Sequence, residues 1–138
     1  MQVEPFGTFH APLSRVEFRG DVSRGHRLVG PIVDSRIDGP LLRARQEGTS
    51  AADWLLQGPD GTVLIDVRAS MRTDDGARLQ LTYRGRAHWP DGVGSGPVRA
   101  AFVFETDAPE YQWLCSRMIV GVGSVEQTHG LYSLAMLR

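Results

Sequence analysis

Turn-forming residues recur at short intervals along the chain and divide it into segments of strand length. The turns are Gly20-Asp, Gly30-Pro, Asp38-Gly-Pro, Gly58-Pro-Asp-Gly, Asp74-Asp-Gly and the glycine-rich stretch 90–97. Short segments separated by Gly, Pro and Asp turns are typical of antiparallel sheets, because parallel strands need long crossover connections. The spacing therefore predicts an all-β sandwich or barrel.

The clearest hairpin joins residues 62–72 to residues 77–85 through the turn Thr73-Asp-Asp-Gly. Side chains alternate between the two faces of a strand. The first arm places Val63, Ile65, Val67, Ala69 and Met71 on one face and Leu64, Asp66, Arg68, Ser70 and Arg72 on the other. The second arm alternates in the same way, so we predict a hairpin with one apolar and one polar face.

The polar face of this hairpin allows two interpretations. In a two-layer sandwich it meets solvent, and Asp66 and Arg68 form a surface pair that contributes little to stability. In a closed barrel it can instead line the lumen, where Asp66 and Arg68 belong to the wall of a ligand cavity. The alternation alone does not distinguish these two arrangements.

The last third of the chain contains its densest group of chemically capable residues. Residues 98–105 are predicted to form a strand, and Thr106 or Asp107 is placed to cap a short helix near 107–115. Two closing strands are expected at 117–123 and 129–137, where Gly121 and Gly123 permit a bulge or a close approach of the backbone. A barrel with this single helix closing one end is one assembly that these elements allow.

The composition fits a single domain spanning residues 1–138, with 41% hydrophobic and 22% charged residues. The apolar runs are too short to cross a bilayer, and the first residues do not have the pattern of a secretory signal. Cys115 is the single cysteine, which excludes an internal disulfide and suits a reducing cytosol. We therefore expect a cytoplasmic protein with no membrane partner.

All 15 basic residues are arginine, and 16 acidic residues bring the net charge to −1. The arginines are scattered and lie near acids, as in Asp66-Val-Arg, so no basic stripe of the kind that follows nucleic acid is visible. We expect no nucleic-acid partner. The lack of lysine also excludes Schiff-base chemistry on a lysine side chain.

Standard metal and cofactor signatures are missing from the sequence. The four histidines have no ligand spacing with one another or with Cys115, and no dinucleotide or P-loop motif is complete. No metal and no cofactor are therefore expected. Acid/base residues remain: Glu105 and Asp53 are candidate proton-transfer groups, and Arg68 is a candidate anion holder. Asp75 is explained as a turn residue and His88 as a solvated loop residue.

Five short motifs, in order, resemble the domain of unknown function 3237 family from about Gly25 onward. They are Ala52-Asp-Trp54, Leu64-Ile-Asp-Val-Arg68, Arg72-Thr-Asp-Asp-Gly-Ala77, Phe104-Glu-Thr106 and Tyr111-Gln-Trp-Leu114. The resemblance implies a calycin-like antiparallel barrel in small cytoplasmic proteins that self-associate, so a homo-oligomer, a dimer or higher, is expected. The family pattern continues with Asn after Tyr-x-Trp-Leu, where this chain has Cys115.

Three functional hypotheses follow. The first is a cofactor-independent lyase, isomerase or cyclase acting on an aromatic or polyketide-like compound, in which Glu105 or Asp53 moves a proton and Arg68 holds an enolate or carboxylate. The second is a binder of a small organic ligand in the same cavity, and the third is a homo-oligomeric structural module. The residues expected to contact the ligand are Trp54, Asp66, Tyr83, Tyr111 and Trp113. The first two hypotheses gain support if Asp53, Asp66, Arg68 and Glu105 converge on one concave, aromatic-walled pocket. Both fail if these side chains are dispersed over the outer surface.

Overall fold

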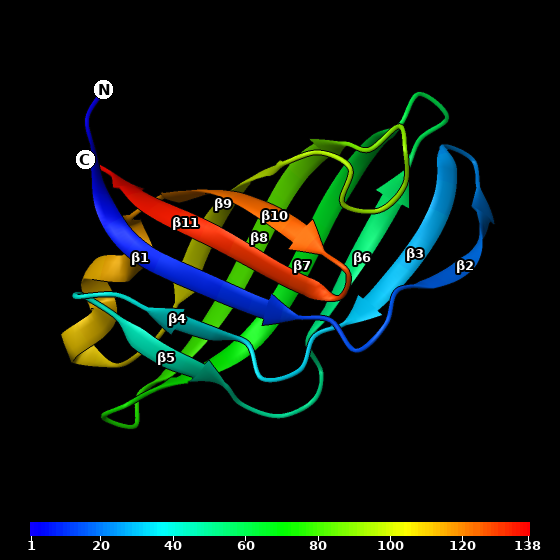
Figure 1. Cartoon of the computed structure of the whole chain (residues 1–138). Helices are drawn as coiled ribbons and strands as arrows, with labels where there is room; N and C mark the ends of the chain where they lie inside the picture. Colours follow the sequence, from blue (N-terminus) through cyan, green and yellow to red (C-terminus); the bar gives the residue numbers. More distant parts are fainter.

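Eleven strands and one 3₁₀ helix form the protein in the computed structural model, which describes residues 1–138 (Figure 1). The strands are β1 (Val3–Pro12), β2 (Glu17–Val22), β3 (Gly25–Pro31), β4 (Arg36–Asp38), β5 (Arg43–Gln46), β6 (Ala52–Gln57), β7 (Thr62–Thr73), β8 (Arg78–His88), β9 (Val98–Glu105), β10 (Ile119–Glu126) and β11 (His129–Leu137), and the helix is η1 (Pro109–Ser116). Every strand pair is antiparallel. The all-β prediction is confirmed.

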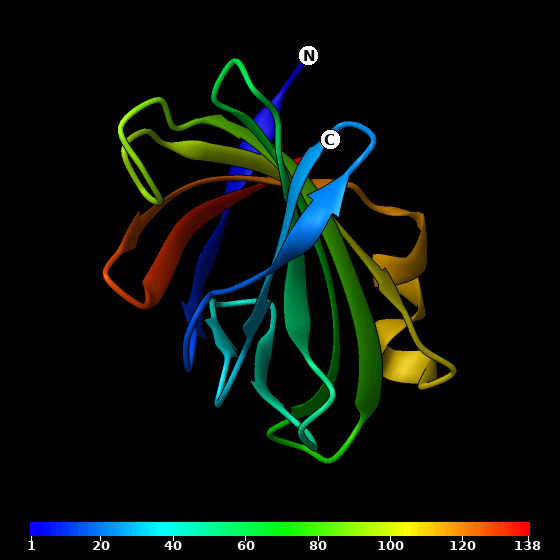
Figure 2. The same ribbon diagram turned by 90° about the vertical axis from the view of Figure 1, so that its right-hand side faces the viewer.

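Eight strands close into a barrel in the order β7-β5-β4-β1-β11-β10-β9-β8, because β8 also pairs with β7. The remaining strands are β6, β3 and β2. They continue the sheet from β7, where β6 pairs with the same edge of β7 as β5 does. Residues 71–73 of β7 pair with β5, whereas residues 63–68 pair with β6. The sheet therefore forks along β7. Figure 2 shows β2 and β3 in front of the barrel, on the side away from η1.

Apolar side chains fill the inside of the barrel. Four aromatic rings, those of Phe9, Tyr83, Phe102 and Tyr132, contact one another there, with Tyr83 stacked on Phe102 at a centroid distance of 4.5 Å. An eight-stranded barrel is only just wide enough for its own side chains. The polar face of β7 consequently points outward, and the interpretation that Asp66 and Arg68 line the lumen is wrong.

The predicted β7–β8 hairpin is present with the predicted faces. Val63 to Met71 in alternate positions are buried, and Leu79, Leu81 and Tyr83 are buried on β8. Gly76 has a positive φ of 92°, and the N–H of Ala77 donates to Thr73 Oγ1 at 2.8 Å. The Asp-Asp-Gly sequence thus forms the tight turn, as expected for residues of these types.

Helix η1 lies across one end of the barrel (Figure 1). Its residue Leu114 packs into the core and has no exposed surface. Its N-terminal cap differs from the prediction. Ala108 occupies the cap position and no side chain caps the helix. The Thr106 hydroxyl instead accepts the N–H of Ala108 at 3.1 Å and donates to the Arg78 carbonyl at 2.7 Å, so it ties the start of the helix to β8. The fold contains no helix of the length and hydropathy needed to span a membrane.

Candidate functional site

The four side chains expected to converge lie in three separate places. Asp53 points into the barrel and is buried. Asp66 lines a large groove on the outer face of the sheet. Arg68 and Glu105 line a separate depression of about 210 Å³. The single pocket that the enzyme and the ligand-binding hypotheses both required of these four side chains is therefore absent, which counts against both hypotheses in that form.

Arg68 and Glu105 line the same depression on the outer surface of β7, β8 and β9 but form no ion pair with each other. Both side chains are exposed, and Glu105 pairs across the sheet with Gln80. The other polar side chains there include Ser70, whose hydroxyl donates to Gln80 Oε1 at 2.8 Å. The exposure of Glu105 removes the buried, aromatic setting on which its role as a general base depended.

The predicted aromatic contacts are also dispersed. Tyr83 is part of the barrel core, and Trp113 is half-buried against that core. Tyr111 donates its hydroxyl to Asp75 Oδ1 at 3.0 Å, which connects η1 to the β7–β8 turn. Burial and this carboxylate both raise the pKa of Tyr111. Of the predicted ligand contacts, only Trp54 and Asp66 lie in the large groove.

Asp53 forms an unusual internal site on β6. The β6–β7 ladder pairs residues 52–53 and 56–57 of β6 but is interrupted between them, and Asp53 Oδ1 accepts the N–H of Asp66 at 3.3 Å in this gap. Burial raises the pKa of Asp53 to about 7, and the nearby Asp66 charge acts in the same direction. Burial raises the pKa values of Tyr83 and Tyr132 as well, with a further contribution from the Asp53 charge. A carboxyl group with a pKa near neutral thus lies close enough to two phenols for its charge to raise their pKa values.

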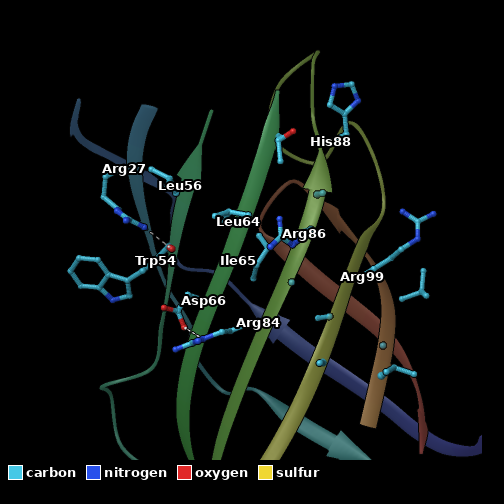
Figure 3. Close-up of a pocket in the computed structure, with 18 residues that line it drawn as sticks. Arg27, Trp54, Leu56, Leu64, Ile65, Asp66, Arg84, Arg86, His88 and Arg99 are labelled. Atoms are coloured by element: carbon cyan, nitrogen blue, oxygen red, sulfur yellow. Dashed lines mark hydrogen bonds and ion pairs between the residues drawn. The ribbon is translucent and has the colours of Figure 1, made fainter. Parts of the chain in front are cut away.

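The large groove runs over the outer faces of β3, β6, β7, β8, β9 and β10 (Figure 3) and has a volume of about 1120 Å³. Nine of its eighteen lining residues are hydrophobic. Its charged lining consists of four arginines, Arg27, Arg84, Arg86 and Arg99, and a single carboxylate, Asp66. In a chain with a net charge of −1, this surface is locally positive.

The polar atoms of the groove are only partly satisfied by one another. Arg27 Nη1 donates to the Trp54 carbonyl at 3.0 Å, and Arg84 Nε lies 3.6 Å from Asp66 Oδ1. That Asp66 oxygen is buried and accepts no hydrogen bond. Arg86 and Arg99 form neither an ion pair nor a side-chain hydrogen bond. The groove therefore offers free donors over an apolar floor, an arrangement suited to an organic anion.

None of the four groove arginines, Arg27, Arg84, Arg86 and Arg99, was a candidate site residue from the sequence. They are scattered along the chain, and only the pairing of β3, β6, β7, β8 and β9 brings them onto one face. Arg84 and Arg86 alternate with buried Tyr83, Gly85 and Ala87, so their outward direction was predictable. No group of three or more His, Cys, Asp or Glu side chains has an arrangement that would hold a metal ion.

The family described as a protein of unknown function, DUF3237, matches residues 1–137. The chain belongs to the DUF3237 family. This confirms the resemblance and extends it to β1 and β2. The chain is 27% identical over 108 residues to a UPF0311 protein of Clostridium acetobutylicum, an alignment covering 70% of this chain and 68% of that relative.

Solved structures show the same fold. A β-barrel-like protein of Acinetobacter baumannii has a TM-score of 0.88 and 28% identity, covering 99% of this chain and 96% of its own. A protein of unknown function from Clostridium acetobutylicum has a TM-score of 0.90 at 21% identity and covers both chains fully, at 100% each. An enzyme from Penicillium herquei has a TM-score of 0.69 at 20% identity, covering 97% of this chain and 96% of its own.

The five DUF3237 motifs occupy identifiable places in the barrel. Ala52-Asp-Trp54 and the 64–68 motif lie on the adjacent strands β6 and β7, on either side of the interrupted ladder. The 111–114 motif lies in η1. Cys115, where the resemblance predicted Asn, is exposed and directs its thiol to the Thr106 carbonyl at 3.6 Å. The thiol thus supports the strand-to-helix corner and lies outside the groove.

Proposed function

We propose that this DUF3237 protein binds a small organic molecule in the outer groove. The observation that carries the proposal is the combination of a volume of about 1120 Å³, a half-hydrophobic lining and four arginines with one carboxylate. Ligand sites for small molecules commonly have volumes of about 300–1,000 Å³, with apolar walls and a few placed polar groups. An aromatic or polyketide-like compound that carries a negative charge matches this surface.

Native mass spectrometry of the gently purified protein tests this proposal. We expect a bound mass that disappears on mild denaturation and that is strongly reduced in Ala101→Trp, because Ala101 lies on the outer face of β9 within the groove. Thr8→Trp is the matched control, since Thr8 is exposed on β1 and does not line the groove. A bound mass that persists unchanged in Ala101→Trp would place the ligand elsewhere.

An acid/base reaction is a second candidate, supported by Asp53. A carboxyl with a pKa of about 7 is suited to proton transfer near neutral pH, and one fold relative is described as an enzyme. Asp53 is buried and does not line the groove, so a reaction would require the substrate to reach the interrupted β6–β7 ladder. Once a ligand is identified, turnover that is lost in Asp53→Asn with unchanged affinity would support catalysis. Undiminished turnover would exclude Asp53 as the proton-transfer group.

A further inference from the structure

One row of outward side chains crosses the floor of the groove (Figure 3). Strand pairing places Arg27 opposite Leu56, Leu56 opposite Leu64, Leu64 opposite Arg86, and Arg86 opposite Arg99. Neighbouring strands lie about 4.8 Å apart. The row therefore has Arg27 at one end, two leucines in the middle, and the Arg86–Arg99 pair at the other end.

The Arg86–Arg99 pair places two arginines directly opposite each other on neighbouring strands. Like charges directly opposite each other on neighbouring strands destabilise a sheet. Both side chains are exposed, and neither has a carboxylate partner. Arg84, the preceding outward residue on β8, differs because it has Asp66 directly opposite it.

Elsewhere in the chain, a carboxylate bridges two arginines that lie opposite each other on neighbouring strands. Arg72 and Arg78 also lie directly opposite each other, on β7 and β8. The carboxylate of Glu47 bridges them, with Oε2 3.2 Å from Arg72 Nε and Oε1 3.3 Å from Arg78 Nη2. The Arg86–Arg99 pair has the same cross-strand arrangement but no such carboxylate, and it borders an apolar floor instead.

We propose that Arg86 and Arg99 bind the acidic group of the groove's ligand, a carboxylate or a phosphate, in the way that Arg72 and Arg78 bind Glu47. The inference rests on the proposed function, because it concerns the same groove and names the class of its ligand. The apolar body of the molecule lies over Leu64 and Leu56, toward Arg27 and Trp54. Planar guanidinium groups suit both anions, since each presents paired N–H donors to two oxygens.

Isothermal titration calorimetry with three matched probes tests the inference: 2-naphthoate, 2-naphthyl phosphate and the neutral 2-naphthamide. We expect the wild-type protein to bind at least one of the two anions about tenfold or more tightly than the amide, the range expected for a hydrogen bond to a charged group. The comparison of naphthoate with naphthyl phosphate distinguishes a carboxylic acid from a phosphate ester. In the double variant Arg86→Gln, Arg99→Gln, binding of the preferred anion should fall to the level of the amide.

Arg45→Gln is the matched control, because Arg45 is an exposed strand arginine without an ion pair that lies outside the groove. It should leave the affinity for all three probes unchanged. Thermal unfolding of the double variant should show a Tm at or above the wild-type value, since the variant removes a repulsive pair. Three results would each overturn the inference. The first is equal affinity of the wild-type protein for the anions and the amide, the second is no binding of either anion, and the third is anion binding that the double variant retains. The first and last of these results would still be compatible with a ligand in the groove.

Discussion

At the scale of single residues, Asp53 stands out because it is a carboxyl group buried among apolar side chains. It is buried, and its carboxyl accepts a hydrogen bond from the N–H of Asp66, which the interrupted ladder leaves without a backbone partner on β6. A protonated carboxyl performs this role without placing a charge in the core, and burial accordingly raises its pKa to about 7. The folded chain thus holds a proton that the unfolded chain releases near its ordinary pKa of 3.8.

This difference makes stability depend on pH. Between about pH 4 and pH 7 the folded state binds more protons than the unfolded state, so stability falls as pH rises and levels off above the folded pKa. Each pKa unit corresponds to about 1.4 kcal/mol, so the loss is on the order of 4 kcal/mol. Asp53→Asn keeps the acceptor oxygen but does not ionise, and it should be more stable than the wild-type protein at pH 8 and similar at pH 4. Urea unfolding at both pH values measures this.

The exposed Asp107→Asn should follow the wild-type protein at both pH values, because the Asp107 side chain makes no hydrogen bond or ion pair. A stability difference between the wild-type protein and Asp53→Asn that is the same at pH 4 and pH 8 would show that folding does not raise the pKa of Asp53.

At the scale of elements, two glycines of β10 let two aromatic rings approach its backbone closely. Gly121 and Gly123 point inward on this strand, against Phe102 and Tyr132 respectively. The pairing of β10 with β9 and β11 continues without a register shift. Of the two uses that the sequence allowed for these glycines, the close approach is the one observed. The rings take up the space that Cβ atoms at positions 121 and 123 would occupy.

We expect Gly123→Ala to destabilise the fold. An added Cβ would lie within 2.7 Å of Tyr132 Cε2, so the ring would have to move against Phe9 and Phe102. Overpacking of this kind typically costs about 1–3 kcal/mol. Chemical denaturation monitored by tryptophan fluorescence measures the change, with the outward neighbour Ser124→Ala as the control. Equal stability of the two variants would indicate that the core near Tyr132 accommodates a methyl group.

At the scale of the whole molecule, the sequence predicted which face of a strand a side chain occupies better than it predicted which residues lie opposite each other on neighbouring strands. The alternation in residues 62–72 and 77–85 correctly assigns buried and outward side chains, because a period of two depends only on the strand itself. Asp53 was harder to place, since Asp53 and Leu55 share one face while Trp54 takes the other, and hydropathy alone favours a buried tryptophan. The opposition of Arg86 to Arg99 depends on how β9 pairs with β8 after the 89–97 loop, which no local pattern specifies.

The outer surface of β9, β10 and β11 bears on how the whole molecule assembles. Val103, Met118, Val122 and Leu131 are exposed there, and Val103 and Met118 flank the paired residues Phe102 and Ile119. Contiguous exposed apolar surface on a folded domain commonly marks an interface. We propose that this face joins copies of the chain into a homo-oligomer. A two-fold arrangement would bring the same surface of two copies together.

Size-exclusion chromatography with light scattering should then give a mass of at least two chains for the wild-type protein and one chain for Val103→Arg, Met118→Arg. The two arginines would place unpaired charge in the interface, which the dimer cannot bury without a large cost. Thr8→Arg, on the exposed face of β1, should keep the wild-type mass. Since Val122 belongs both to this face and to the groove, an assembly through β10 would partly cover the ligand site. If the oligomer binds 2-naphthoate more tightly than the monomeric variant does, the second copy completes the groove. If the wild-type protein is a monomer, this face is not a self-association surface.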